Sequence, residues 1–109
     1  MVKIKFFLKK SEILGFEVIG HTAYAEKGQD IVCSAISVLA QTAILGLGDF
    51  LKKDSYSYDI KDGYLSCKLQ DNLPKAEYDK AQIVLRTVYL GMKSIEKEYK
   101  MYVKILEEV

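Results

Sequence analysis

Residues 20–37 read Gly-His-Thr-Ala-Tyr-Ala-Glu-Lys-Gly-Gln-Asp-Ile-Val-Cys-Ser-Ala-Ile-Ser, and this stretch decides the first half of the fold. A strand-like run, residues 14–19, precedes it. Asp30 belongs to the residue types that favour a helix N-cap, and an apolar run follows it at once. The stretch therefore predicts a strand, a glycine-containing loop and a helix whose first residue is Ile31.

The same stretch holds the only histidine, His21, and one of the two cysteines, Cys33. The predicted helix places Cys33 in the first turn, where unused backbone N–H groups favour a thiolate and can hold an oxyanion. A nearby imidazole lowers the pKa of a thiol in the same direction. A cysteine in an apolar helix is also typical of a small core residue, and a histidine after a glycine is typical of a turn. Both interpretations, a catalytic pair and structural residues, stay open on residue types alone.

The pattern resembles the signature of the ribosomal-processing cysteine protease (Prp) family. It is a Gly-His pair at residues 20–21, a Gly-x-Asp-Ile-Val-Cys run at residues 28–33, and a serine four residues after the cysteine. Ser34 departs from the small residue, often alanine, that is common in the family, and this changes little. Residues 22–27 do not match closely, so nothing is carried onto them.

The resemblance implies that His21 and Cys33 form a catalytic dyad, with Asp30 and Ser37 as supporting residues close to the site. Asp30 can cap the helix, orient the imidazole, or do both, and the sequence leaves these alternatives open. Residues 22–29 are expected to be mobile without substrate and ordered with it, with glycines 20 and 28 as hinges. The resemblance also implies the substrate, a large-subunit ribosomal protein with a short N-terminal extension that is cut next to paired aromatic residues.

The remaining pattern predicts an α+β fold, with two helices against an antiparallel sheet in the order β-β-α-β-β-α-β. Alternating side chains predict strands over residues 2–9, 14–19, 56–61 and 65–69, with the turn Asp62-Gly63 between the last two. In the second strand, the predicted core face holds Leu14, Phe16 and Val18. Apolar side chains at helical spacing follow Pro74 as far as Tyr99, and residues 102–106 are predicted as a final strand. Cys67, on the core face of its strand, is predicted to be a structural residue.

The 109 residues suit a single domain, residues 1–109, and the net charge of +1 argues against a surface built mainly to bind nucleic acid. Lys3, Lys5, Lys9 and Lys10 are interpreted as a solvated strand face, and no direct nucleic-acid binding is expected. Two cysteines without a Cys-x-x-Cys pair, together with one histidine, predict no metal site, and no motif indicates a cofactor. The absence of a secretory signal predicts a cytoplasmic protein.

The apolar stretch Ile31 to Gly48 is too polar for a membrane span and is predicted to be a buried helix. Two strongly apolar helices exceed what one small sheet covers, and the resemblance points the same way, so a homodimer is expected. Two alternatives to a peptidase remain open from the sequence. One is a non-catalytic ribosome-assembly module that binds a ribosomal protein or RNA, and the other is a thiol sensor in which Cys33 is oxidised.

Overall fold

A computed structural model describes residues 1–20 and 27–109, with side chains described for residues 1–20 and 31–109. Its elements are β1 (Val2–Lys9), β2 (Glu12–Ile19), α1 (Lys27–Phe50), a short 3-10 turn η1 (Lys53–Ser55), β3 (Tyr56–Lys61), β4 (Tyr64–Leu69), α2 (Lys75–Glu98) and β5 (Val103–Glu108). The predicted α+β class and the order β-β-α-β-β-α-β are confirmed. The last strand, predicted over residues 102–106, is present as β5.

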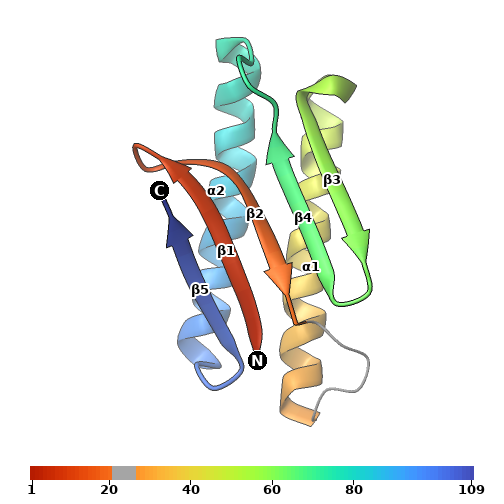
Figure 1. Ribbon diagram of the computed structural model, residues 1–109, viewed down its shortest axis with the longest axis vertical. Helices are drawn as coiled ribbons and strands as arrows, with labels where there is room; N and C mark the ends of the chain where they lie inside the picture. Colours follow the sequence, from red (N-terminus) through yellow and green to blue (C-terminus); the bar gives the residue numbers. More distant parts are fainter. Residues whose placement is uncertain (21–26) are drawn as a thin grey trace.

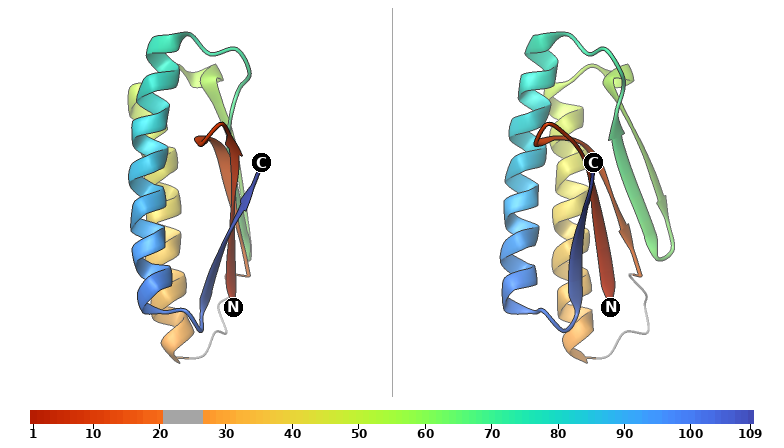
Figure 2. Two further views of the ribbon diagram at one scale, coloured as in Figure 1. Left: turned by 90° about the vertical axis from the view of Figure 1, so that its left-hand side faces the viewer. Right: turned by 60° about the vertical axis from the view of Figure 1, so that its left-hand side comes forward.

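The five strands form one sheet in the order β3-β4-β2-β1-β5. Both helices pack side by side on one face of the sheet and leave the other face open (Figures 1 and 2). Three of the strand pairs are antiparallel, as predicted, whereas β5 runs parallel to β1. The cause is α2, which crosses behind the sheet and returns the chain to the end where β1 begins.

The core lies between the sheet and the two helices. Val2, Ile4 and Phe6 of β1 are fully buried, and the Phe6 ring lies edge-on to Tyr89 of α2 with centroids 4.9 Å apart. The helices approach each other closely where a Cβ added to Gly46 would lie 3.1 Å from Val84. Burial of this kind on one face of each element is the main source of stability in a domain of this size.

The predicted core face of the second strand is wrong at Leu14. The pairing of β1 with β2 shifts between Phe7 and Leu8, so that Leu14 is left out of the register and Ile13 is buried in its place. Such a bulge frees backbone groups. Here the Gln82 side chain of α2 satisfies both groups of Ile13: the Ile13 N–H donates to Oε1 at 2.8 Å, and Nε2 donates to the Ile13 carbonyl at 2.7 Å.

The predicted start of the first helix is also wrong. α1 begins at Lys27, so Asp30 lies inside its first turn instead of at the N-cap, and Gly28 is a helical residue instead of a loop hinge. Extending a formed helix adds one hydrogen bond for each residue that it fixes, and lysine and glutamine accept helical geometry well. The N-cap preference of Asp30 is a weaker effect than this propagation.

One stretch of the described chain, Ile31–Phe50, has the length and hydropathy of a membrane span. In the fold it is the greater part of α1, which packs on the sheet and on α2 (Figure 2). A core helix passes the same test of length and composition. Only 39% of this stretch is buried, so the prediction of a buried helix holds for its inner face, whereas Ile31, Val38 and Leu45 are exposed.

Candidate active site

The second strand, β2, ends at Ile19, and the residue that follows it, Gly20, has a backbone conformation that requires a glycine. Its φ is +94°, and a Cβ at this position would lie 2.7 Å from the Met1 carbonyl oxygen. The Gly20 N–H donates to the Gly63 carbonyl at 3.1 Å, which joins the end of β2 to the turn between β3 and β4. Gly20 therefore sets the point at which the chain leaves the sheet immediately before His21. His21 itself, and the predicted loop as far as residue 26, lie outside the described residues.

Cys33 lies on the core side of α1 and is 1% exposed. The sequence predicted Cys33 in the first turn of the helix. Because α1 begins at Lys27, Cys33 lies in the second turn instead. Only the first four N–H groups of a helix lack partners within it. The N–H of Cys33 is therefore used inside the helix, and it is not one of the unused donors that the sequence predicted around this residue.

Ser37 lies one helical turn after Cys33 and lines a small cleft of about 50 Å³ between α1 and the paired strands β3 and β4. Its hydroxyl oxygen accepts a hydrogen bond from Gln41 Nε2 at 2.9 Å. The walls of the cleft are mainly apolar. They comprise Val18, Ala40, Ile60 and Leu65, with Ser37, Gln41, Lys61 and Tyr64 as the polar members.

The structure thus brings two of the predicted site residues, Cys33 and Ser37, to neighbouring turns of α1. The backbone of Asp30 is in the same helix, and its side chain is outside the described set. Sequence reasoning missed the cleft residues Gln41, Ile60 and Tyr64. Gln41 carries the one signal that was available, a polar side chain four residues after Ser37 in an otherwise apolar helix.

Cys67 has the environment of an inert thiol. It is 1% exposed in β4, and burial raises the pKa of its thiol to about 12. The thiolate is the reactive form of cysteine, so Cys67 is not a nucleophile near neutral pH. The prediction that Cys67 is a core residue is confirmed. Among the side chains described, those of residues 1–20 and 31–109, no group of three histidine, cysteine or acidic residues could hold a metal ion.

Comparison with known proteins identifies the class. A family model described as cysteine protease Prp matches residues 1–104. The ribosomal processing cysteine protease Prp of Bacillus subtilis is 28% identical over 100 residues, covering 89% of this chain and 88% of that protein. The Staphylococcus aureus (strain Mu50) protein of the same name is 29% identical over 89 residues, covering 79% and 78%. The fold and the match define a cysteine protease. The chain belongs to the Prp family, as the resemblance predicted.

Solved structures show the same fold. A crystal structure of SMU.848 from Streptococcus mutans has a TM-score of 0.81 and 26% identity, with 99% of this chain and 94% of that chain covered. The ribosomal processing protease Prp from S. aureus, in complex with a substrate peptide, has a TM-score of 0.85 and 19% identity. That alignment covers 99% of this chain and all of the S. aureus chain.

Proposed function

We propose that this chain, acting as one domain of residues 1–109, is an endopeptidase in which Cys33 is the nucleophile and His21 the general acid and base. The observation that supports the proposal is the placement of Cys33 one helical turn before Ser37 on α1, with Ser37 lining a cleft near the end of β2. Gly20 fixes the direction of the chain immediately before His21. The family signature supplies the roles of the two residues.

In this mechanism His21 accepts the Cys33 proton, and Sγ attacks the peptide carbonyl carbon. The tetrahedral intermediate collapses as the C–N bond breaks, and His21 returns the proton to the leaving amine. The acyl group stays on Sγ as a thioester. Water then attacks the thioester with His21 as the base, which releases the new carboxylate and restores the thiol. Asp30 is the residue that we expect to orient the imidazole.

The substrate class follows from the family. The B. subtilis and S. aureus relatives are named ribosomal processing proteases, and the S. aureus enzyme has been solved with a substrate peptide and with a covalently linked product peptide. For this chain we propose a large-subunit ribosomal protein with a short N-terminal extension, cut beside paired aromatic residues.

The proposal includes a homodimer in the cytoplasm. Ile31, Val38 and Leu45 are more than half exposed and recur every seven residues along α1, which places them in one apolar stripe on the outer side of the helix. A second copy would bury this stripe in an isologous contact. Sedimentation at micromolar concentration tests this part separately, and a monomeric mass contradicts it.

The catalytic proposal is tested with a synthetic peptide that carries the extension and the following residues of the ribosomal protein. We expect cleavage at one bond by the unaltered chain, no cleavage by Cys33→Ala, and normal cleavage by the matched control Cys67→Ala. His21→Ala is expected to lower the single-turnover rate by about 10²–10⁴-fold with little loss of peptide affinity. Binding of the peptide without cleavage by the unaltered chain would favour the assembly-module alternative.

A further inference from the structure

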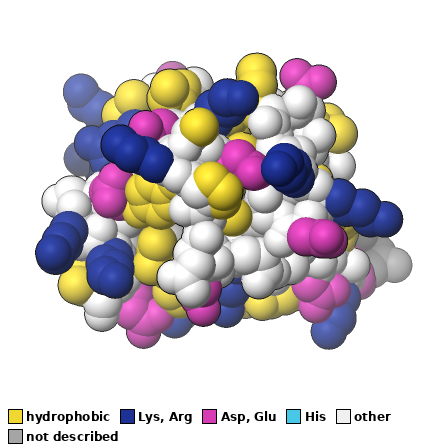
Figure 3. Space-filling model, turned by 90° about the horizontal axis from the view of Figure 1, so that it is seen from above, with side chains coloured by type: hydrophobic (Ala, Val, Ile, Leu, Met, Phe, Trp, Pro, Cys, Tyr) yellow, Lys and Arg dark blue, Asp and Glu magenta, His cyan; other side chains and the backbone are white. Residues whose placement is uncertain are grey.

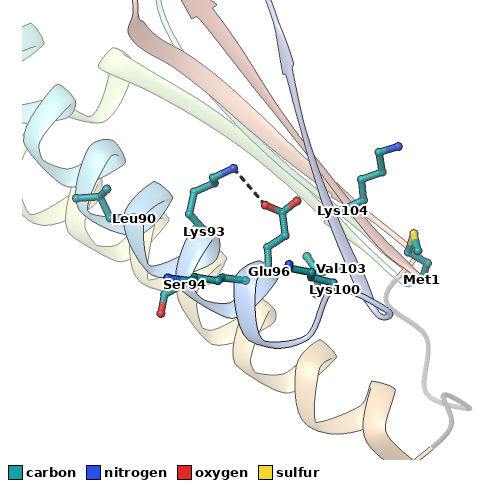
Figure 4. Close-up of a pocket in the computed structure, with 9 residues that line it drawn as sticks. Met1, Leu90, Lys93, Ser94, Glu96, Lys100, Val103 and Lys104 are labelled. Atoms are coloured by element: carbon teal, nitrogen blue, oxygen red, sulfur yellow. Dashed lines mark hydrogen bonds and ion pairs between the residues drawn. The ribbon is translucent and has the colours of Figure 1, made fainter.

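A second concave region is lined by none of the cleft residues, although Met1, which contacts Gly20, lies at one end of it. It is an open groove of about 720 Å³ between the C-terminal half of α2 and the beginning of β5 (Figure 4). Four lysines line it: Lys93, Lys97, Lys100 and Lys104. They come from both walls, since the first two are on α2, Lys100 is in the connection and Lys104 is on β5. The exposed Leu90 lies at the end of the groove nearest the middle of α2.

Glu96 is the one carboxylate in the described lining, and its oxygens are already engaged. Oε2 accepts the Ile105 N–H at 2.6 Å, and Oε1 accepts a hydrogen bond from Lys93 Nζ at 3.2 Å (Figure 4). Three of the lysines have no carboxylate within ion-pair distance among the described residues: Lys97, Lys100 and Lys104. Three ammonium groups are therefore available to a ligand.

The positive charge continues past the groove onto the open face of the sheet. Lys104 of β5 lies directly beside Lys3 of β1 in the parallel register. Paired strands are about 4.8 Å apart, so these two stems start close together and on the same face. The opposite end of the molecule, around η1 and the start of α2, shows lysines interspersed with acidic side chains (Figure 3). The net charge of +1 therefore does not describe the groove, whose described lining holds four lysines and one glutamate.

We propose that this lysine groove binds the phosphate backbone of RNA. Lysine acts as a flexible point charge that suits phosphates, whereas carboxylate recognition favours the bidentate fork of arginine. In the part of the chain that the structure describes, the groove is lined by no arginine and by no aromatic ring on which a base could stack. Contact is therefore with the backbone and independent of sequence. This departs from the sequence-based expectation of no direct nucleic-acid binding.

The test is fluorescence anisotropy with a labelled oligouridylate of about 12 nucleotides, a length within the range covered by one small domain. Each phosphate contact on a single strand contributes about −0.7 to the slope of log affinity against log salt, so three to four lysines predict a slope of about −2 to −3. Lys97→Gln with Lys100→Gln removes two contacts. The slope should then move towards zero by about 1.4, and affinity at low salt should fall about tenfold or more.

The matched control is Lys53→Gln with Lys80→Gln, which removes the same charge from exposed positions on η1 and early α2. This variant should keep the slope of the unaltered chain. Equal losses in both double variants would show a general charge effect and overturn the assignment to the groove. No binding at low salt would overturn the site altogether. A labelled polyglutamate of equal length that binds as tightly as the RNA would overturn the choice of ligand. Peptide cleavage by the groove variant should be unchanged, so the outcome is independent of the catalytic proposal.

Discussion

Removal of the Cys67 thiol should change how stability depends on pH. The thiol is 1% exposed, and burial raises its pKa from 9.0 to about 12. In the unfolded chain the thiol ionises near its ordinary value, so above about pH 9 the unfolded state holds fewer protons than the folded state. Stability therefore falls as pH rises from the unfolded towards the folded pKa. Cys67→Ala removes this contribution.

The size of the effect follows from the pKa. At about pH 10, one unit above the pKa of the thiol in the unfolded chain, Cys67 lowers the free energy of unfolding of the unaltered chain by about 1.4 kcal/mol relative to neutral pH. Near neutral pH the variant should be less stable by roughly 1 kcal/mol or more, because truncation leaves a small cavity. The gap between the two proteins should therefore close by about 1.4 kcal/mol between about pH 7 and 10.

Urea unfolding of both proteins at the two pH values measures this gap. Every other titrating group, Cys33 included, is present in both proteins and cancels in the difference. An unchanged gap would refute the argument that Cys67 is held as a neutral thiol in the core. Peptide cleavage by the variant, measured near neutral pH, should match that of the unaltered chain.

Three further predictions concern positions around the site and the sheet. Gly20→Ala should lower the free energy of unfolding by about 1–2 kcal/mol or more, and it should lower turnover. The φ of +94° disfavours a side chain, and the Met1 carbonyl leaves no room for Cβ. Unchanged urea unfolding would contradict this. Gln82→Ala should lower stability by about 1–3 kcal/mol, since it leaves both backbone groups of Ile13 without partners, and a neutral result would contradict the role given to Gln82 at the bulge. The pKa of Glu77 is lowered in the folded protein, mainly by a hydrogen bond from the Ser55 hydroxyl. The ionised carboxylate therefore stabilises the fold at a pH above its pKa in the unfolded chain, and this stabilisation is lost as the pH falls through its pKa in the folded protein. Thermal unfolding of Glu77→Gln should accordingly be less sensitive to acid below about pH 4.5 than that of the unaltered chain.

Much of the architecture was predictable because its signals are local. Strand alternation, the Asp62-Gly63 turn and the helical spacing after Pro74 each act within a few residues. The bulge at Leu14 was not predictable, because it depends on Gln82, almost seventy residues away, to satisfy the backbone that it exposes. The parallel pairing of β5 likewise depends on where α2 returns the chain.

In the candidate site, too, local signals were visible in the sequence and tertiary packing was not. Cys33 was singled out because the sequence places it near a predicted helix start and close to the only histidine, and Ser37 because it matches the family signature. The cleft that Ser37 lines combines α1 with β2, β3 and β4, so its far wall, Ile60 and Tyr64, comes from tertiary packing that no local pattern records. The early start of α1 also moved Cys33 from the first to the second turn of the helix.

The most direct test of the central claim is to find where the acyl intermediate forms. The extended ribosomal-protein peptide is mixed with the protein, the reaction is quenched in acid during the first turnover, and the protein is digested and mapped by mass spectrometry. The account predicts an added mass equal to that of the N-terminal product less one water, because the acyl group replaces the thiol hydrogen. This mass should be carried by the fragment that contains Cys33 and be absent from Cys33→Ala. Full cleavage by Cys33→Ala, or an adduct on Cys67, would contradict it.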